Sequence, residues 1–420
     1  MFFSNRYFHF FALIWLVALL VACGGGGGGD GGSGAPTPPA VPTVSVLPTP
    51  VVQSNLLDVI VDSGPANSGP NVNRLYTSVS ICQPGSTTLC QTIDHVLLDT
   101  GSTGLRLLSS VMAPALSLSR VTGTSGLPLL SCEQFVDGSF AWGPVAKADI
   151  VLGSKIASNV PIQVIADPDF SSLSQSCSRS GTSLTSVSKI GANGILGLGL
   201  FKQDCGAGCI SNASNGFYYT CTSVSCKGAT ASLAQQLQNP VPIFAADNNG
   251  VLIDLPAASS GSASVLNGSL IFGVGTQSNN QLPSTVLAAN DYGYITTQIG
   301  VQNFTKSFID SGSNGLFFDS ATIQRCSSSF IGFYCPPLIT TLSAKMVGSN
   351  AVPTSSFPFF IDNASTLFAG GVNAVTPNLS GPMGSSTSFD WGLPFFYGRR
   401  VFFGIEGMSP SLATGGFYAF

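Results

Sequence analysis

An acidic motif that occurs twice constrains the fold of this 420-residue chain more than any other feature of its sequence. The first copy, at 96–105, reads VLLDTGSTGL, and the second, at 307–316, reads SFIDSGSNGL. In each copy an apolar run typical of a β-strand ends at an aspartate, Asp99 or Asp310, and a Gly-Ser turn follows. The two aspartates lie 211 positions apart, about the length of one domain, so the repeat predicts two related lobes.

A second repeated feature is an apolar, glycine-containing segment downstream of each copy, at 194–199 (GILGLG) and at 391–396 (WGLPFF). Other short apolar runs, such as 148–152 and 269–272, are bounded by Gly, Asn, Ser and Pro, which is typical of strands. A short helix is expected over 229–237. These patterns predict an all-β, bilobal fold with few short helices.

The two aspartates also predict a chemistry. An aspartate that leaves a strand into a Gly-Ser turn is held against backbone N–H groups, and Gly101 and Gly312 allow a close backbone approach. Two carboxyl groups about 3 Å apart, here Asp99 and Asp310, cannot both ionise and therefore share one proton. The ionised group activates a water molecule and the protonated group polarises a carbonyl, so neither a metal nor a cofactor is expected.

Composition excludes several other classes. Charged residues make up 8% of the chain and the net charge is −4, so no basic field is present to bind nucleic acid. The chain has two histidines, and one of them, His9, lies in a predicted leader. A multi-histidine zinc site is thereby excluded, and a Ser-His-Asp triad would depend on His95. We interpret His95 as a surface residue at the start of a strand.

The N-terminus reads as a targeting segment. Residues 1–22 are predicted to form a signal peptide, because an apolar run of signal-peptide length follows a basic start. The run ends in LVAC, which resembles a bacterial lipobox and predicts lipid attachment at Cys23. The Gly- and Pro-rich segment 23–50 is predicted to be a tether, and Gly24 after the cysteine favours the outer membrane. The alternative is ordinary secretory cleavage beside an incidental cysteine.

Cysteine usage agrees with export. Apart from Cys23 the chain has ten cysteines, an even number that permits five disulfides in an oxidising compartment. Closure between near neighbours is the expected arrangement, although a metal site made by the four cysteines of 205–226 is a competing interpretation. The expected groups are Cys82–Cys90, Cys326–Cys335, a local set of Cys205, Cys209, Cys221 and Cys226, and, by elimination, Cys132–Cys177.

Taken together, the motifs resemble those of the pepsin-like, bilobal aspartic peptidases. Besides the two Asp motifs, the resemblance includes 76–80, 268–273 and 395–403, and it covers roughly residues 55–420. Within that superfamily the chain also resembles a bacterial lipoprotein family catalogued as a domain of unknown function, for which no activity is implied. The pepsin-like resemblance implies a catalytic dyad of Asp99 and Asp310. It implies support for this dyad from Thr100, Gly101, Ser102, Ser311, Gly312 and Ser313.

Three features depart from the pepsin pattern. The family's flap hairpin, with its Tyr, matches a stretch here in which Phe135, Ser139 and Trp142 are the candidate flap residues. Arg106 stands where the family usually has a flap-supporting Trp. If Arg106 faces the dyad, its charge lowers a carboxyl pKa, and if it faces solvent this effect vanishes. A basic pro-segment is also not recognisable, because 24–51 contains neither Lys nor Arg.

The sequence therefore predicts a monomeric aspartic endopeptidase with an N-terminal lobe at 51–260 and a C-terminal lobe at 261–420. An extended peptide or unfolded protein substrate would lie in the interlobe cleft as an added strand. The alternative is a catalytically silent envelope protein that keeps the fold and binds an extended peptide or protein partner. A glycosidase would need two carboxyl groups roughly 5–9.5 Å apart, and no motif supports one.

Overall fold

The computed structural model describes residues 55–178, 181–222, 225–258, 262–327, 330–369, 371, 373–409, 411–413 and 415–420. The predicted signal peptide, the tether with Cys23 and the lobe boundary expected between 260 and 261 lie outside these ranges. Within them, no helix combines the length and the apolar character that crossing a membrane requires.

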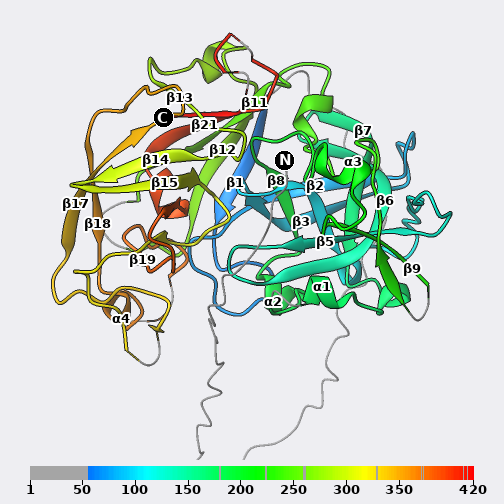
Figure 1. Cartoon of the computed structure of the whole chain (residues 1–420), viewed down its shortest axis with the longest axis horizontal. Helices are drawn as coiled ribbons and strands as arrows, with labels where there is room; N and C mark the ends of the chain where they lie inside the picture. The colour runs from blue at the N-terminus through cyan, green and yellow to red at the C-terminus, as the bar shows by residue number, and fades with distance from the viewer. Residues whose placement is uncertain are drawn as a thin grey trace, which may run out of the picture.

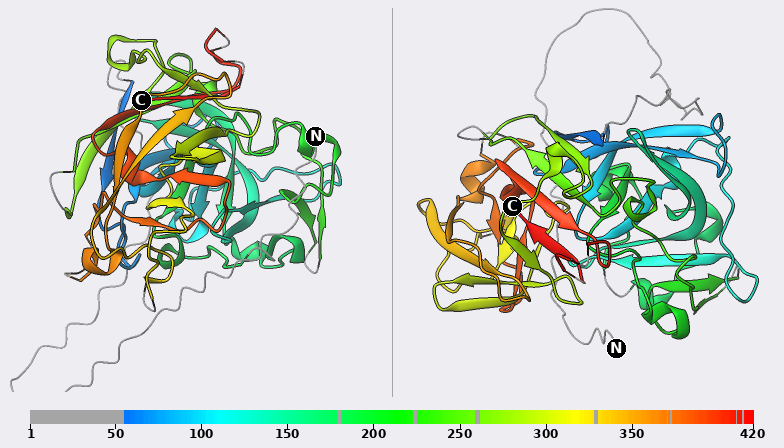
Figure 2. Two further views of the ribbon diagram at one scale, coloured as in Figure 1. Left: turned by 60° about the vertical axis from the view of Figure 1, so that its left-hand side comes forward. Right: turned by 90° about the horizontal axis from the view of Figure 1, so that it is seen from above.

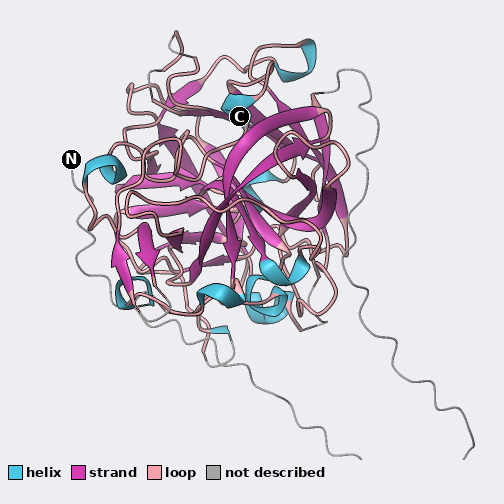
Figure 3. Ribbon diagram, turned by 90° about the vertical axis from the view of Figure 1, so that its right-hand side faces the viewer, coloured by secondary structure: helices cyan, strands magenta, loops and turns pink. Residues whose placement is uncertain are grey.

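The described chain is mostly β, with two barrel-like sheets and a few short helices at the periphery (Figures 1 and 3). The larger sheet has fifteen described strands, and a pairing between β2 and β6 connects positions far apart in its order. Its strands are β1 (Leu56–Val61), β2 (Leu75–Cys82), β3 (Cys90–Asp99), β4 (Thr103–Leu108), β5 (Leu129–Gln134), β6 (Phe140–Leu152), β7 (Lys155–Ile165), β8 (Gly194–Leu198), β9 (Tyr218–Cys221), β10 (Cys226–Gly228), β11 (Gly250–Leu255), β12 (Leu266–Phe272), β13 (Val286–Ala288), β21 (Arg399–Gly404) and β22 (Phe417–Ala419).

The smaller sheet has seven described strands and lies on the opposite side of the molecule from β2–β8 (Figure 2). Its strands are β14 (Ile295–Ile299), β15 (Gln302–Ile309), β16 (Leu316–Phe318), β17 (Thr340–Val347), β18 (Phe357–Ile361), β19 (Ser380–Gly381) and β20 (Ser388–Trp391). The short helices are α1 (Gln175–Ser178), α2 (Val187–Ile190), α3 (Gly208–Ser211), α4 (Ala364–Leu367) and the 3₁₀ turns η1 (Ser109–Val111), η2 (Pro168–Phe170), η3 (Val241–Ile243), η4 (Ser278–Asn280) and η6 (Leu393–Phe396).

Strands β1, β12, β11 and β21 connect the N-terminal half of the chain to its C-terminal half. β1 pairs antiparallel with both β2 and β12, and β11 pairs antiparallel with β12 and β21. Figure 1 shows β1, β11 and β12 running between the two groups of strands. Since these ladders bury backbone hydrogen bonds and apolar side chains between the halves, the relative position of the two groups is fixed by ordinary sheet pairing.

The apolar patterns explain why most of these strands form. The runs at 148–152 and 269–272, predicted as strands, fall within β6 and β12. Every residue of β4 and β8 is buried, which agrees with the apolar sequence of β8 (GILGL), whereas β4 (TGLRLL) also buries the charged Arg106. The phenylalanines of 395–403 are buried in the core, and 395–396 lie in η6 rather than in a strand.

The predicted helix at 229–237 was wrong. The segment makes a single turn, in which the backbone N–H groups of Gln235 and Gln236 both donate to the Ser232 carbonyl. The side chain of Gln235 accepts hydrogen bonds from the Ser232 N–H and hydroxyl. The Leu237 N–H donates to the Tyr218 hydroxyl, so the local bonds and a tertiary contact replace a continued helix.

The sequence repeat corresponds to a repeated strand arrangement. In the N-terminal copy, β3 pairs parallel with β8, and β8 pairs antiparallel with β4. In the C-terminal copy, β15 pairs parallel with β20, and β20 pairs antiparallel with β16. Each central strand, β8 or β20, therefore lies between the strand that precedes an Asp motif and the strand that follows it. In the first copy the predicted segment 194–199 coincides with β8, whereas in the second copy only Trp391 of the predicted segment 391–396 lies in the neighbouring strand, and 393–396 form η6.

All ten described cysteines form disulfides. The pairs Cys82–Cys90, Cys326–Cys335 and Cys132–Cys177 are confirmed, and the local set of four is resolved into two short loops rather than a thiolate metal site. Those two loops are Cys205–Cys209 and Cys221–Cys226. Five disulfides are typical of an oxidising, extracytoplasmic location.

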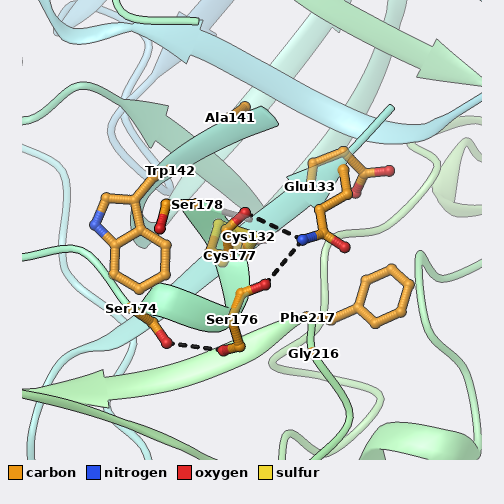
Figure 4. The surroundings of a disulfide bond; sticks show 12 residues. Cys132, Glu133, Ala141, Trp142, Ser174, Ser176, Cys177, Ser178, Gly216 and Phe217 are labelled. Atoms are coloured by element: carbon orange, nitrogen blue, oxygen red, sulfur yellow. Dashed lines mark hydrogen bonds between the residues drawn. A yellow bond between two sulfur atoms is a disulfide. The ribbon is translucent and has the colours of Figure 1, made fainter. Parts of the chain in front are cut away.

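The disulfides are expected to contribute to stability according to loop length. Cys132–Cys177 spans 45 positions and joins β5 to α1 beside Trp142 (Figure 4), whereas Cys205–Cys209 spans 4. From loop-closure entropy, replacing the first pair by alanines costs about 4 kcal/mol and replacing the second costs about 2 kcal/mol. Urea unfolding of the two double variants measures both losses. Equal losses would contradict the loop-length account.

Candidate functional site

The two Asp-Gly-Ser turns meet at the centre of the molecule through hydroxyl groups. The Thr100 hydroxyl accepts the N–H of Ser311 at 2.9 Å, and the Ser311 hydroxyl accepts the N–H of Thr100 at 3.2 Å. Each hydroxyl also donates across the interface, Ser311 to the Leu98 carbonyl at 2.7 Å and Thr100 to the Ile309 carbonyl at 3.4 Å. Because all four bonds cross between the copies, they fix one turn against the other with approximate twofold symmetry.

Above these hydroxyls, Asp99 is held by its own turn. One carboxyl oxygen accepts the Gly101 N–H at 2.8 Å, and the other accepts the Ser102 hydroxyl at 2.5 Å. The side chain is buried, with 6% exposure. Two donors in fixed positions determine which oxygen faces the other copy.

The second copy repeats this geometry. One oxygen of Asp310 accepts the Gly312 N–H at 2.7 Å, and the other accepts the Ser313 hydroxyl at 2.8 Å. Oδ1 of each carboxyl group lies beside Gly312, where an added Cβ atom would be 2.6 Å from Asp99 Oδ1 and 3.1 Å from Asp310 Oδ1. The six turn residues expected to support a dyad therefore all lie around the two carboxyl groups.

The two glycines are required by this close approach. A Cβ atom on Gly101 would lie 2.7 Å from the Asp310 carboxyl carbon, and one on Gly312 would lie 2.6 Å from an Asp99 carboxyl oxygen. Both separations are shorter than carbon atoms tolerate, so each glycine makes room for the carboxyl group of the opposite copy.

The environment favours one proton on the pair. Burial, and then the negative charge of Asp99, raise the pKa of Asp310 to about 8, while the Ser313 and Gly312 donors act in the opposite direction. A carboxyl group that keeps its proton near neutral pH next to a second carboxyl group is the arrangement needed for general acid–base catalysis.

A third carboxyl group, Asp390 on β20, lies beside the pair. Only 3% of Asp390 is exposed, and burial, followed by the charge of Asp310, raises its pKa well above the usual range. Sequence analysis missed this residue because the repeated segment was read as starting at the following Trp391. The available signal was an aspartate within an otherwise apolar strand, at the position that Ile195 occupies in the first copy.

Arg106 faces neither the dyad nor solvent, the two orientations that were considered from the sequence. Its side chain is fully buried and donates to the carbonyls of Thr103 and Gly104 and to the carboxyl group of Glu133. A second carboxyl group, that of Asp204, lies 3.8 Å away. Burial raises the pKa of Asp204 to about 7 and also raises that of Glu133, while Arg106 lowers both. Arg106 therefore connects β4 to β5 close to the turn of the β5–β6 hairpin, one pair before its last one.

The hairpin itself is present where a flap was expected, but its candidate residues have other contacts. Phe135 packs on a core cluster, and Ser139 bonds to Asp137 within the tip. Trp142 is buried and donates to the Phe170 carbonyl at 3.2 Å. The exposed Val136 at the tip, which sequence analysis did not single out, is the hairpin residue that lines a pocket next to the dyad.

This pocket, of about 170 Å³, lies between the dyad turn of the first copy and residues of the C-terminal half. Its volume is below the roughly 300–1,000 Å³ of a drug-sized ligand site, so it suits one side chain rather than a whole small ligand. Apart from Val136, its apolar and aromatic lining comes from Leu200, Phe201, Tyr292, Tyr294, Phe308, Ile309 and Tyr418.

His95 contacts carboxylates outside the dyad. Its ring nitrogens lie 2.9 Å from Asp94 and 3.1 Å from Asp62. Partial burial opposes a charge on the ring, but the hydrogen bonds to Asp94 and Asp62 outweigh it and raise the histidine pKa. No cluster of three or more His, Cys, Asp or Glu side chains suited to a metal ion occurs in the described part of the chain.

Comparison with known proteins identifies the family. Residues 51–420 match the family described as protein of unknown function (DUF3443), and the chain therefore belongs to it. No curated protein matches the chain.

Removal of the Ser311 hydroxyl is expected to destabilise the protein. Ser311→Ala leaves the buried Thr100 N–H and Leu98 carbonyl without this partner, which costs about 1–3 kcal/mol in the free energy of unfolding. Ser343→Ala, at an exposed position of β17, is the control and changes the value by less than about 0.5 kcal/mol. Equal effects in urea unfolding would argue against the cross-copy bonds.

Asp310 is expected to make the stability depend on pH. Its folded-state pKa is about 8, and an unfolded aspartate titrates near 4, so this contribution is fully present below about pH 4. As the pH rises towards 8, the unfolded state releases a proton that the folded state keeps, and stability falls by up to about 1.4 kcal/mol per pH unit. Asp310→Asn removes this component, and Asp58→Asn, an exposed site, keeps it. The measurement is the free energy of unfolding in urea as a function of pH. If this free energy changed with pH in the same way in wild type and in Asp310→Asn, the raised pKa would be contradicted.

Proposed function

We propose that this member of the DUF3443 family is a pepsin-like aspartic endopeptidase in which Asp99 and Asp310 activate water. The observation that carries the proposal is the pair of Asp-Gly-Ser turns, held together by hydroxyl–backbone bonds, with the two carboxyl groups in contact. The repeated order of β3, β8 and β4 and of β15, β20 and β16 supports a bilobal pepsin-like fold, with the lobes at 51–260 and 261–420.

The proposed mechanism assigns different roles to the two aspartates. Asp310 carries the shared proton, since its pKa is raised to about 8, and Asp99 serves as the base. Asp99 removes a proton from water while the water oxygen attacks the peptide carbonyl carbon, and Asp310 donates its proton to the carbonyl oxygen. The Asp99 proton then passes to the amide nitrogen while a hydroxyl group of the tetrahedral intermediate returns a proton to Asp310, so that the C–N bond breaks and the dyad regains its starting protonation. The reaction needs neither a metal nor a cofactor.

An extended peptide or an unfolded protein segment is the proposed substrate. Val136 from the hairpin and Tyr292 from the C-terminal half line one pocket together with the dyad turn, so a chain there contacts both halves. The apolar and aromatic lining suits one large apolar substrate side chain. An extended backbone would add hydrogen bonds in the manner of an extra strand.

The proposed location is the bacterial cell envelope. The five disulfides indicate an oxidising compartment. The lipobox-like sequence suggests in addition that Cys23 carries a lipid anchor, which we place in the outer membrane. In this arrangement the 23–50 tether would let a monomeric catalytic unit reach substrates at some distance from the membrane.

Peptide release from a denatured protein mixture, followed from pH 3 to pH 8, tests the proposal. The exported wild type is expected to cleave, and Asp99→Asn and Asp310→Asn are each expected to lose at least about 100-fold in kcat/KM, because each removes one acid–base group. Asp58→Asn is the matched control, an exposed carboxyl group removed by the same substitution.

Folded wild type without cleavage at any pH would contradict the peptidase. Binding of extended peptides by that protein, measured by calorimetry, would then favour the alternative, a silent envelope protein that holds a peptide partner. The contact between Asp99 and Asp310 and the bonding of Arg106 away from them favour the peptidase over this alternative.

A further inference from the structure

A buried arginine on β4, Arg106, breaks the match between the two copies of the motif. Seven positions after the aspartate, the first copy has Arg106 and the second has the apolar Phe317. The Arg106 side chain has no exposed surface, and the removal of a charge from water carries a desolvation cost. An apolar side chain would fill this place without that cost. Packing alone therefore does not explain Arg106.

The guanidinium group of Arg106 contacts three different segments of the chain. It donates to the carbonyl of Thr103, directly after the dyad turn, at 2.8 Å. Its Nη2 atom donates to the Glu133 carboxyl group of the β5–β6 hairpin. The Asp204 carboxyl group, in the segment that follows β8, lies 3.8 Å from the same atom. A planar cation with several donors can hold such a set of acceptors in a fixed geometry.

These three segments form walls of the pocket next to the dyad. Thr103 lines the pocket itself. Glu133 lies three residues before Val136, which lines the pocket from the hairpin tip. Asp204 lies three residues after Phe201, which lines it from the segment 199–204. The guanidinium group is not part of the lining, so it joins these walls without facing the substrate.

Glu133 holds one face of the hairpin, and a disulfide holds the other. Side chains alternate along β5, so Glu133 faces away from Cys132, and Figure 4 shows its carboxyl group pointing away from Trp142. Beyond Glu133 the tip is closed by a backbone bond from the Phe135 N–H to the Ser139 carbonyl at 2.9 Å. Loss of the Glu133 contact would therefore free one face of the tip while the disulfide remains.

The segment 199–204 is held by a second group besides Arg106. Both carboxyl oxygens of Asp204 accept the Tyr218 hydroxyl, at 2.6 and 2.8 Å. The Asp204 N–H donates to the Leu237 carbonyl at 3.1 Å. Tyr218 belongs to β9, which pairs with β5 of the hairpin. The segment and the hairpin thus share their supports, and the arginine is the charged link between them.

We propose that Arg106 is a positioning residue for the substrate. Through Glu133 and Asp204 it sets the distance between the hairpin tip and the segment 199–204, and thereby the width of the pocket that takes a substrate side chain. This inference rests on the proposed peptidase function. The bonds that hold the Asp99 carboxyl group come from its own turn, so the cluster acts on substrate binding and leaves the dyad in place.

Amide hydrogen exchange of the whole exported protein tests the positioning and needs no cleavage. Glu133→Ala is expected to speed exchange at 135–139 on the order of 10-fold, because the tip loses its contact with Arg106. Glu133→Gln keeps an acceptor oxygen and is expected to restore slow exchange. Unchanged exchange at 135–139 in Glu133→Ala would overturn the inference.

The matched control cuts another bond between an arginine and a carboxyl group. Asp254 on β11 lies 3.2 Å from Arg400 on β21, and neither residue lines the pocket. Asp254→Ala is expected to leave exchange at 135–139 as in wild type. The same acceleration there in Asp254→Ala as in Glu133→Ala would contradict a specific role for the Arg106 cluster.

Arg106→Met tests whether one side chain holds both walls. It is expected to speed exchange at 135–139 and at 199–204, whereas Glu133→Ala speeds exchange at the tip alone. A change confined to the tip in Arg106→Met would overturn the link between the walls. If circular dichroism shows that this variant does not fold, the double variant Arg106→Met/Glu133→Gln, which removes one charge of each sign, takes its place with the same expectation.

The split between KM and kcat tests the effect on the substrate. For a cleaved peptide whose large apolar side chain fills the pocket, Glu133→Ala is expected to raise KM about 10-fold and to keep kcat within about threefold. For the same peptide with glycine at that position, KM is expected to change by less than about threefold, because the pocket stays unfilled. Glu133→Gln is expected to restore KM. A fall in kcat at unchanged KM would overturn the positioning role.

The two experiments separate two kinds of failure. If wild type cleaves no peptide, the peptidase proposal fails, and hydrogen exchange still decides whether Arg106 positions the two walls. If wild type cleaves, but Glu133→Ala changes neither the exchange at 135–139 nor KM, the positioning role alone is wrong.

Discussion

The hydroxyl–backbone contact between the two turns is the interaction on which the site depends. Thr100 and Ser311 exchange four hydrogen bonds with the opposite copy, and none of these groups reaches solvent. A buried hydroxyl without partners is costly, so the two turns are stable in contact and not apart. Because Asp99 and Asp310 directly precede these residues, the same bonds bring two carboxyl groups together against their mutual repulsion. The hydrogen bonds of Thr100 and Ser311 thus compensate for the electrostatic repulsion between Asp99 and Asp310.

Much of this site follows from the sequence, since a repeated motif at a spacing of one lobe has few geometric solutions. The strand before each aspartate and the turn after it lie where the repeat placed them, and so does the neighbouring strand β8 of the first copy; in the second copy the neighbouring strand β20 begins three residues before the predicted segment. The hydrogen bonds of the turns are equally local, because each Asp is bonded by residues two and three positions later. Hydrogen bonds between residues close in sequence, in a motif that occurs twice, are therefore the part of the site that can be predicted well from the sequence.

Contacts set by tertiary packing were harder to predict. A buried arginine such as Arg106 needs carboxylate partners, and Glu133 and Asp204 lie 27 and 98 positions away with no motif to connect them. The hairpin was located, but its twist decides which tip residue faces the dyad, and the small Val136 was not distinguished from its larger neighbours. The helix expected over 229–237 does not form, because the Gln235 side chain accepts hydrogen bonds from Ser232 and these bonds compete with the backbone hydrogen bonds of a helix.

The duplication also explains why an asymmetric site is possible. Two identical lobes would place identical groups around both carboxyl groups, and the shared proton would have no preferred side. In this chain the first copy has the apolar Ile195 next to its dyad strand, and the second has Asp390. The acidic cluster therefore lies on the Asp310 side, where burial raises the pKa of both Asp310 and Asp390. Two turns with the same local geometry thus lie in different surroundings, because one repeat has a buried carboxyl group where the other has an apolar side chain.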